Sequence, residues 1–282
     1  MGERIKPVRV PDLKNMKRRG EKIAMLTAYD ASMARLLDRA GIDILLVGDT
    51  LGMVIEGHDS TIPVTLEAIV HHTRAVARGT RRALVVADMP FGTYHVSVSE
   101  AVRNASRLIQ EGGAAAVKIE GGRVVLDVAS RLADIGIPVM GHLGMQPQSI
   151  HRQGGFRRQA RNDEDAQELI AEAQTLEAAG VFALVLEAIP AEVAARVTRE
   201  LTIPTIGIGA GPGCDGQVLV SYDMFGLFDE FVPSFVKQYA QLGREMVAAT
   251  EEYVADVRRG RFPAEEHTMR GRVSRPVPAK QE

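Results

Sequence analysis

The sequence lacks several features on which common protein classes depend. Its 282 residues contain a single cysteine, Cys214, which excludes an intramolecular disulfide and a metal site built from several thiolates. The 34 lysines and arginines nearly balance the 36 aspartates and glutamates. A net charge of −2 gives the chain no global field for binding nucleic acid or an anionic membrane.

Targeting and membrane signals are also missing from the sequence. No apolar run approaches the roughly 20 residues that span a bilayer. The charged start, MGERIK, shows no secretory signal, and Lys6 stands where a myristoylation signal needs Ser or Thr. We therefore expect a cytoplasmic protein with no nucleic-acid or membrane partner. The basic run Lys14, Lys17, Arg18 and Arg19 is more typical of a solvated helix face than of a binding patch.

The sequence does have a regular alternation of short apolar runs and longer helical stretches. A hydrophobic fraction of 45% and a length of 282 residues suit one α/β barrel with a substantial core. Residues 1–21 are polar, and Val8, Val10 and Leu13 are the expected docking points of a short N-terminal arm or helix. The pattern predicts eight strands, at 22–27, 42–47, 83–87, 115–119, 137–141, 182–186, 203–208 and 217–220.

Helical spacing of apolar residues lies between these runs and after the last one. The clearest examples predict helices over 65–79, 97–111, 164–179 and 234–259. Strands that are apolar throughout are typical of a parallel sheet covered by helices. Eight such units predict a single (β/α)8 TIM barrel with an N-terminal helical arm over residues 1–263. The polar, proline-rich residues 264–282 predict a flexible tail.

An open doubly wound sheet is the alternative fold. It predicts a glycine-rich turn after the first strand, and the sequence there, LTAYDAS, contains no glycine.

Charged residues follow or end five of the predicted strands. In a barrel of this kind the chemistry lies at the carboxyl ends of the strands. In strand order these ends carry Asp49, Asp88, Glu120, His142 and Glu187. Lys118 precedes Glu120 by two residues, so both side chains point to the same side of the strand. We expect all six side chains to meet at one mouth.

Asp49 illustrates the alternative explanation for each of these acids. An aspartate after a strand commonly caps the helix that follows it. Capping explains one acid well but explains four acids on different strands poorly, so we favour a functional cluster. Carboxylates with few histidines favour Mg²⁺ over Zn²⁺. A 2-oxo acid could chelate such an ion, which would stabilise the enolate formed when a carboxylate base removes a proton from the neighbouring carbon.

Longer motifs carry a family resemblance that covers about residues 5 to 267. These motifs are LVGDTLGMVIEGHDSTIPVT, ADMPFGTY, VKIEGG, GHLGMQPQS, LVLEAIP and IGIGAG, the last followed by DGQVLV and YDMFG. In this order they resemble the ketopantoate hydroxymethyltransferase family, barrels of the phosphoenolpyruvate/pyruvate type. The resemblance implies transfer of a one-carbon unit from 5,10-methylenetetrahydrofolate to 3-methyl-2-oxobutanoate, giving ketopantoate for pantothenate and coenzyme A synthesis. It also implies one Mg²⁺ per subunit and a homo-oligomer, a decamer in the family.

The resemblance assigns roles to the motif residues. It implies that Asp49 and Asp88 ligate Mg²⁺ and that Glu120 completes the site, directly or through water. Lys118 would hold the substrate's oxygens, and Glu187 would remove the proton from C3. The resemblance also implies substrate contacts from Asp49, Thr50 and Asp88, and from His142 in the pocket wall. The family often has Ser where this chain has Thr50.

Other features of the sequence suit more than one interpretation. The glycine-rich segment 207–213 could bind phosphate, although a tight turn or an approach to the folate suits a pyruvate-like substrate better. Arg157, Arg158 and Arg161 could meet the anionic tail of folate or form a solvated loop. For the other histidines and the cysteine we expect structural or incidental roles: His58 with Asp59 in a loop, His71 and His72 on a helix, and Cys214.

Three rival functions remain compatible with a barrel. The first is a C–C lyase or phosphonopyruvate-type mutase of the same superfamily, which often has a cysteine in the loop after strand four; that loop reads EGGRVV here. The second is a Schiff-base aldolase that uses Lys118. The third is a catalytically silent binding barrel, which would be expected to lack some of the carboxylates.

Overall fold

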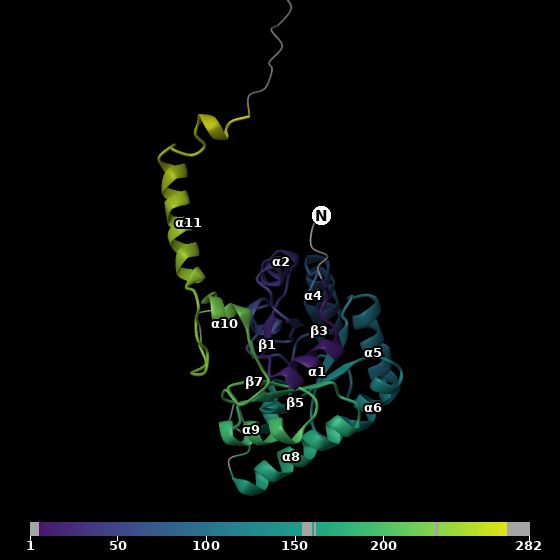
Figure 1. The fold of residues 1–282 in the computed structure, drawn as a ribbon. Helices are drawn as coiled ribbons and strands as arrows, with labels where there is room; N and C mark the ends of the chain where they lie inside the picture. The colour runs from purple at the N-terminus through teal and green to yellow at the C-terminus, as the bar shows by residue number, and fades with distance from the viewer. Residues whose placement is uncertain (1–5, 154–159, 161, 229–230, 270–282) are drawn as a thin grey trace, which may run out of the picture.

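The computed structural model describes residues 6–153, 160, 162–228 and 231–269. Within these residues, eight parallel strands pair in chain order and β8 returns to β1, which closes the barrel (Figure 1). The (β/α)8 prediction is therefore confirmed, and the open doubly wound alternative is wrong. The strands are β1 Ile23–Thr27, β2 Ile44–Val47, β3 Leu84–Asp88, β4 Ala116–Glu120, β5 Val139–Gly144, β6 Ala183–Glu187, β7 Thr205–Ile208 and β8 Gly216–Leu219.

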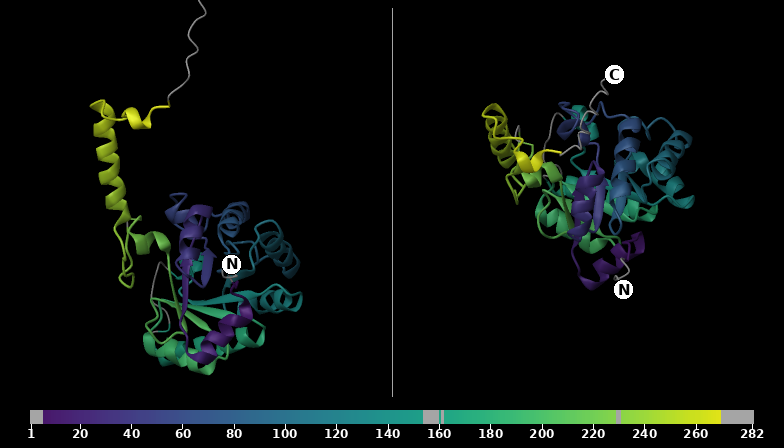
Figure 2. Two further views of the ribbon diagram at one scale, coloured as in Figure 1. Left: turned by 45° about the horizontal axis from the view of Figure 1, so that its top comes forward. Right: turned by 90° about the horizontal axis from the view of Figure 1, so that it is seen from above.

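Helices follow most strands and surround the barrel (Figures 1 and 2). Several begin at a side chain that accepts hydrogen bonds from the first turn, such as Asp30, Thr65, Ser97 and Asn162. The helices are α1 Val10–Arg19, α2 Ala31–Arg39, α3 Leu51–Val54, α4 Leu66–Gly79, α5 Val98–Gln110, α6 Leu126–Asp134, α7 Ile150–Gln153, α8 Asp163–Ala178, α9 Ala191–Glu200, α10 Ser221–Phe225 and α11 Leu242–Arg258.

The predicted strands match the observed ones closely, apart from β5. It was predicted over 137–141 but runs over Val139–Gly144. Its start is delayed because Pro138 has no N–H group to donate to a neighbouring strand. It continues to Gly144 because that residue still pairs with Glu187 on β6.

The helix predicted over 234–259 is shorter than expected. Only Leu242–Arg258 is helical. In the preceding segment the N–H of Tyr239 donates to the carbonyl of Met224, 2.8 Å away. This tertiary hydrogen bond replaces a helical one. The tail predicted from residue 264 begins with a short turn at Glu265–His267, and its residues 270–282 lie outside the described part.

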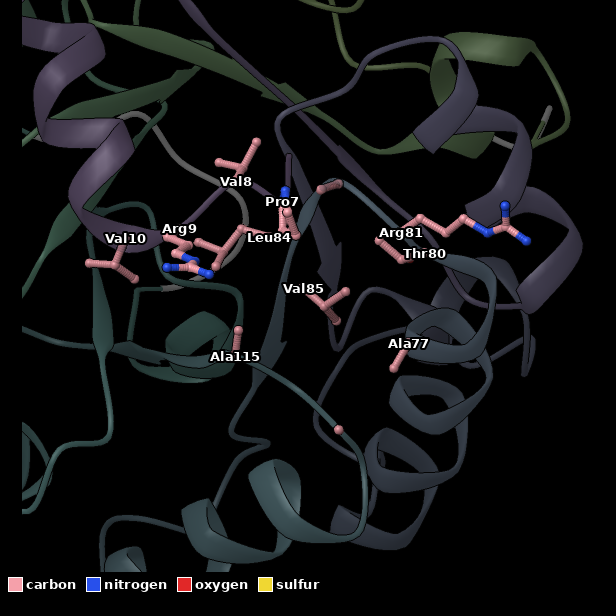
Figure 3. Close-up of a pocket in the computed structure, with 12 residues that line it drawn as sticks. Pro7, Val8, Arg9, Val10, Ala77, Thr80, Arg81, Leu84, Val85 and Ala115 are labelled. Atoms are coloured by element: carbon pink, nitrogen blue, oxygen red, sulfur yellow. The ribbon is translucent and has the colours of Figure 1, made fainter. Parts of the chain in front are cut away.

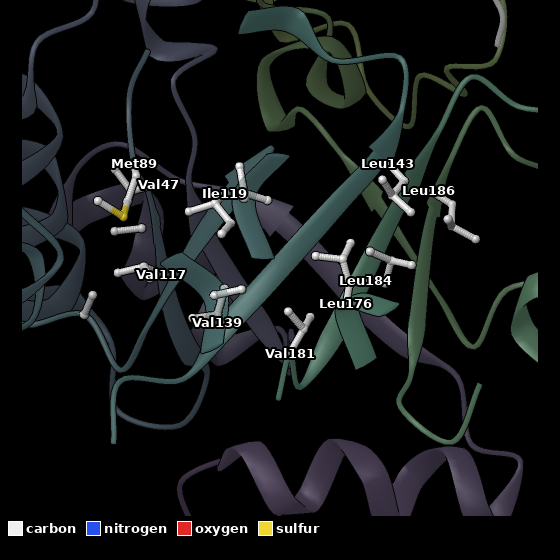
Figure 4. Packing of buried hydrophobic residues seen from close by; sticks show 14 of the residues in the cluster. Val47, Met89, Val117, Ile119, Val139, Leu143, Leu176, Val181, Leu184 and Leu186 are labelled. Carbon is white, nitrogen blue, oxygen red and sulfur yellow. The ribbon is translucent and has the colours of Figure 1, made fainter. Parts of the chain in front are cut away.

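Two apolar layers are separated by the wall of the barrel. The outer layer packs alternate strand residues, such as Val117 and Ile119 of β4, against the surrounding helices (Figure 4). The inner layer fills the barrel and includes Ile44, Leu84, Ala116 and other inward residues. Inward positions nearest the amino ends of the strands are therefore apolar, as in a packed barrel core.

Helix α1 closes the amino-terminal end of the barrel. Leu13 is fully buried and joins the inner layer, with Val8 and Val10 partly buried beside it, which confirms the expected docking points. Lys17, expected on a solvated face, instead holds α1 against the barrel through its ammonium group. Its Nζ donates to the carbonyl oxygens of Thr198 (2.7 Å) and Ile203 (3.0 Å) and lies 2.9 Å from Asp215 Oδ2. The pattern of charges along the sequence does not reveal such tertiary contacts, so the prediction of a solvated face was wrong for Lys17.

Helix α11 projects away from the barrel (Figures 1 and 2). None of its residues is buried, and its apolar side chains Met246, Val247, Tyr253 and Val257 are 45–61% exposed. A cavity of about 840 Å³ lies over β1 and β8 and is lined by Met25, Leu26, Val218 and other residues. In the described part of the chain no helix is both long and apolar enough to cross a membrane.

Candidate active site

The charged residues occupy the next inward positions beyond the apolar layer. On β4, Ala116 belongs to the inner layer, so Lys118 and Glu120, two and four residues later, face the same side. The same alternation places Asp88 of β3 and Glu187 of β6 on the inner side. The period of two along each strand explains why these acids converge at the carboxyl end.

All the predicted site residues line one cavity at this end. Its volume is about 80 Å³, and its lining combines charged residues with the apolar tops of the inner layer. The predicted residues in its wall are Asp49, Thr50, Asp88, Lys118, Glu120, His142 and Glu187. The structure thus brings together every candidate that the strand ends suggested.

Asp49 and Asp88 lie side by side at the ends of β2 and β3. The N–H of Asp49 donates to Asp88 Oδ2 at 3.0 Å. Burial and the neighbouring charges of Asp88 and Glu120 raise the pKa of Asp49 well above its ordinary value. Burial also raises the pKa of Asp88, although Lys118 opposes that rise. The pair is therefore held in a field that disfavours two negative charges unless a cation joins them.

Asp49 does not act as a helix cap. The following helix, α3, is a single turn of four residues whose N-cap, Thr50, makes no side-chain capping hydrogen bond. Asp49 Oδ2 instead accepts a hydrogen bond from Gln148 Nε2 at 2.8 Å. The capping explanation for Asp49 is therefore wrong.

Lys118 stands among the three buried carboxylates. Its Nζ lies 2.8 Å from Asp88 Oδ1 and 3.9 Å from Glu120 Oε1. Burial lowers the pKa of Lys118, but the charges of Asp88, Glu120 and Asp49 outweigh burial and raise it overall. The amine is thus held as an ammonium ion, which is a poor nucleophile, and this speaks against the Schiff-base aldolase.

His142 connects Glu120 to Glu187. Its Nδ1 lies 3.2 Å from Glu120 Oε1 and its Nε2 lies 3.1 Å from Glu187 Oε2. Although burial opposes the charged imidazolium, Glu120 raises the pKa of His142 to about 9. Glu187 has the most exposed side chain of the three, at 13%, against 3% for the other two. An imidazolium can therefore orient Glu187 at the accessible edge of the cavity.

The backbone after β6 is strained beside Glu187. Ala188 has a φ of 50°, a left-handed conformation that costs a residue with a Cβ atom about 1–2 kcal/mol. β5 also approaches β6 closely at this point. Only glycine permits this approach at position 144, because a Cβ atom there would lie 2.2 Å from the carbonyl oxygen of Glu187. These features turn the chain sharply just after the carboxylate.

Two residues that sequence reasoning missed support the carboxylates. Gln148, in the loop after β5, donates its N–H to Glu120 Oε2 at 3.0 Å. Tyr94, in the loop after β3, donates its hydroxyl to Gln148 Oε1 at 2.7 Å and accepts the N–H of Glu120 at 3.1 Å. Both residues are nearly fully buried. Their signal was present, since both lie inside the family motifs, GHLGMQPQS and ADMPFGTY.

The donor set suits a hard cation that keeps water ligands. Within the described residues, no three His, Cys, Asp or Glu side chains gather closely enough to hold a metal ion by themselves. Mg²⁺, however, is commonly held by one or two carboxylates together with water and substrate. Asp88 Oδ1 is buried, and although Lys118 Nζ lies 2.8 Å away, no described residue donates a well-oriented hydrogen bond to this oxygen. The adjacent carboxylates of Asp49 and Asp88 therefore fit Mg²⁺.

Larger cavities lie away from these charges. One, of about 450 Å³, is found at the opposite end of the barrel beside Pro7, Val8 and Leu84 (Figure 3). Its charged lining residues are Arg9 and Arg81, which are not accompanied there by a carboxylate or a histidine. The small cavity at the strand ends is the stronger candidate because the shifted pKa values and buried charges cluster there.

The remaining candidates either lie outside the described residues or do not join the charged cluster. Arg157, Arg158 and Arg161 lie outside the described residues. Within the glycine-rich segment, Ile208 lines the cavity, whereas Gly211 and Gly213 pack against α9, where Cβ atoms would crowd Ala191 and Ala195. The other predicted structural residues also stay apart: His58 lies 3.4 Å from Glu56, His72 Nδ1 contacts the carbonyl of Tyr29, His71 packs on His72, and Cys214 is buried.

Comparisons with known proteins agree with this geometry. Residues 7–265 match the family model described as ketopantoate hydroxymethyltransferase. A 3-methyl-2-oxobutanoate hydroxymethyltransferase of Moorella thermoacetica is 56% identical over 263 residues, covering 93% of this chain and 98% of that protein. Two solved structures share the fold at low identity. A 2,3-dimethylmalate lyase of the PEP mutase/isocitrate lyase superfamily has a TM-score of 0.57 and 17% identity, over 92% of this chain and 91% of its own. A phosphonopyruvate hydrolase complex with oxalate and Mg²⁺ has a TM-score of 0.59 and 14% identity, over 92% of each chain.

Proposed function

Because the chain belongs to the ketopantoate hydroxymethyltransferase family, we propose that it transfers a hydroxymethyl group from 5,10-methylenetetrahydrofolate to 3-methyl-2-oxobutanoate, forming ketopantoate. One observation carries the proposal. Three buried carboxylates, a lysine and a histidine face one cavity, and a fourth carboxylate, Glu187, stands at its accessible edge. This arrangement provides a cation site and a separate base.

The residues divide into a binding set and a proton-transfer set. Asp49 and Asp88 would hold one Mg²⁺ per subunit, with Glu120 contributing through water. The bound ion would supply Lewis-acid stabilisation of the negative charge that develops on the oxo acid. Mg²⁺ accompanies oxalate in the phosphonopyruvate hydrolase complex, a protein of the same fold, which is compatible with this assignment.

The chain's own groups account for substrate orientation and proton removal. Lys118 offsets negative charge on the substrate oxygens, and Thr50 lies in the cavity wall where the substrate carboxylate would sit. Glu187 accepts the C3 proton, while His142, 3.1 Å away, keeps its carboxylate directed at the cavity. With water as co-substrate, the methylene group leaves tetrahydrofolate as formaldehyde, and C3 adds to its carbon. The new alkoxide takes the proton held by Glu187 and becomes the hydroxymethyl group.

The proposal is tested by proton exchange at C3 of 3-methyl-2-oxobutanoate in D₂O, followed by NMR. We expect exchange with Mg²⁺, its loss on chelation with EDTA, and ketopantoate formation after the folate donor is added. Glu187→Gln should bind Mg²⁺ normally and reduce exchange by about 10²–10⁴-fold, the usual contribution of a general base. Exchange that persists in this variant would show that another group is the base.

The rival functions give different results in the same assay. A Schiff-base aldolase would be trapped on Lys118 by borohydride in the presence of the oxo acid and would be insensitive to EDTA. A superfamily lyase or mutase would cleave or rearrange its own substrate; no cysteine occurs in the described loop after β4, which contains Gly121, Gly122 and the turn Arg123–Val125. A silent barrel would show no exchange at all.

We also propose a cytoplasmic homo-oligomer. Helix α11 supports the assembly, because its apolar side chains have no cover in the single chain. The cavity over β1 and β8 offers apolar surface that a second copy could cover. Family resemblance suggests a decamer, and analytical ultracentrifugation tests it. A monomeric species at micromolar concentration would contradict the assembly.

A further inference from the structure

Gln148 donates hydrogen bonds to two carboxylates of the site at once. Its side-chain Nε2 lies 2.8 Å from Asp49 Oδ2, and its backbone N lies 3.0 Å from Glu120 Oε2. The first acid follows β2, the second ends β4, and Gln148 itself belongs to the turn Pro147–Ser149 after β5. One uncharged residue therefore joins loops from three strands across the mouth of the barrel.

The orientation of the Gln148 amide is determined by its surroundings. The second hydrogen on Nε2 donates to the carbonyl of Met89 at 3.0 Å, and Oε1 accepts the hydroxyl of Tyr94 at 2.7 Å. A flipped amide would place Oε1 against the Asp49 carboxylate and the Met89 carbonyl, which are both acceptors. All donors and acceptors of the side chain are thus satisfied in one orientation only.

We propose that Gln148 is a positioning residue that fixes the carboxylates of Asp49 and Glu120 relative to each other, with Tyr94 holding its amide in the required orientation. The inference rests on the proposed function, in which Asp49 binds Mg²⁺ and Glu120 supports His142. Like-charged carboxylates repel each other, and a neutral donor between them holds both without cancelling the charge that attracts the cation. Partners of this kind around metal sites typically affect affinity 10–100-fold.

The test uses Gln148→Leu and measures Mn²⁺ binding by calorimetry, without substrate, alongside C3 exchange. Leucine keeps the side-chain bulk and removes the side-chain amide contacts to Asp49, Met89 and Tyr94, while the backbone N–H of residue 148 can still donate to Glu120. We expect Mn²⁺ affinity to fall at least about tenfold. The exchange rate should fall with it and should recover, at least in part, at high Mg²⁺ concentration. A merely structural role would lower the melting temperature and leave Mn²⁺ affinity unchanged.

Asn104→Leu is the matched control. Asn104 Nδ2 donates to the carbonyl of Thr93 at 2.7 Å, so it braces the same loop as Tyr94 without contacting a site carboxylate through that bond. We expect this variant to be less stable but to bind Mn²⁺ within twofold of the wild type. If it weakens binding as much as Gln148→Leu does, or if Gln148→Leu binds normally, the inference is overturned.

Tyr94→Phe provides a second, milder variant should Gln148→Leu fail to fold. Removing the hydroxyl leaves Gln148 Oε1 without its 2.7 Å partner, so the amide loses one of the three contacts that set its orientation. We expect a severalfold loss of Mn²⁺ affinity, and a double variant weaker than the wild type by less than the product of the two single effects. Unchanged affinity in Tyr94→Phe contradicts the inference. A wild-type protein that neither binds Mn²⁺ nor exchanges C3 refutes the proposed function instead.

Discussion

Two lysines at opposite ends of the barrel, Lys17 partly buried and Lys118 buried, show how differently charge can be used in one fold. At the amino-terminal end, Lys17 has three acceptors within 3.0 Å, two backbone carbonyls and Asp215. Asp215 in turn accepts the N–H of Thr205 at 2.8 Å. Every charge there has a close partner, and the cluster fastens α1 to the barrel.

At the carboxyl end, Lys118 faces more negative charge than it can balance. Among the described residues, its only short contact with a carboxylate is to Asp88 at 2.8 Å, and Glu120 lies 3.9 Å away. The pKa of Asp49 is raised well above its ordinary value by burial and by Asp88 and Glu120. We infer that the balanced cluster around Lys17 contributes to the stability of the fold. The cluster around Lys118 instead lowers that stability, and a bound cation would remove this cost.

The comparison is tested most strongly by replacing one acid at each end. Asp49→Asn should reduce C3 exchange at least about 100-fold, since losing even an outer partner of a metal site costs 10–100-fold. Its stability without metal should not fall, because the substitution removes a disfavoured charge. Asp215→Asn should do the reverse, losing about 1–3 kcal/mol of unfolding free energy while exchange is unchanged. Urea unfolding measures the stability of the two variants, and the exchange assay measures their activity. If both variants lose the same unfolding free energy, the contrast between the two ends is wrong.

Lys17→Met tests the structural end alone. Removing the ammonium leaves two carbonyls and a carboxylate without their donor, which should cost about 3 kcal/mol of unfolding free energy. The folded fraction should exchange C3 at the wild-type rate. Arg18→Gln, a change on an exposed neighbour, is the control and should stay within about 0.5 kcal/mol of the wild type. A lower exchange rate in folded Lys17→Met would mean that the two ends are coupled.

The pH dependence of stability should come from the carboxyl end. Because the pKa of His142 is raised to about 9 in the folded protein, its stabilising contribution is complete below pH 6.5 and is lost as the pH rises through 9. Each pKa unit corresponds to roughly 1.4 kcal/mol, so the metal-free protein should lose up to about 3 kcal/mol over this window. Burial and neighbouring charges also raise the pKa of Asp49, so its contribution is likewise lost as the pH rises, beginning from the ordinary carboxyl range. Thermal unfolding from pH 6 to 10 tests this, and His142→Gln should flatten the curve.

The smallest expected effect concerns backbone strain at the carboxyl end. In the described part of the chain, the only non-glycine residues with positive φ are Ala160 and Ala188, and Ala188 directly follows Glu187. Ala188→Gly should raise the unfolding free energy by less than about 1 kcal/mol, because relief of strain is partly offset by glycine's backbone entropy. The matched change Ala171→Gly, inside α8, should lower it by about 1 kcal/mol. Differential scanning calorimetry of both variants is the measurement.

Features with a short period along the chain could be predicted from the sequence. All eight strands were found because their apolar runs are continuous, and the shared side of Lys118 and Glu120 follows from a spacing of two. The convergence of the acids follows from the closed parallel barrel. Proline explains the one strand whose start was predicted too early, since Pro138 precedes β5.

Contacts between distant segments could not be predicted in this way. Gln148 is 99 residues from Asp49, and nothing in its turn shows which carboxylate it meets. Lys17 resembled a surface lysine because its partners lie more than 180 residues away. The start of α11 was misplaced for the same reason, since Tyr239 donates to Met224 rather than along a helix.

The pairing of β1 with β8 can form only late in the synthesis of the chain. β1 ends at Thr27, and its partner strand ends only at Leu219. At about 5–20 residues per second, a ribosome needs roughly 10–40 s to make the intervening chain. During that interval one edge of β1 has no neighbour, and exposed edges of this kind invite aggregation. The closed sheet protects the mature enzyme, but in the nascent chain the free edge of β1 must be protected from aggregation until the last strand emerges.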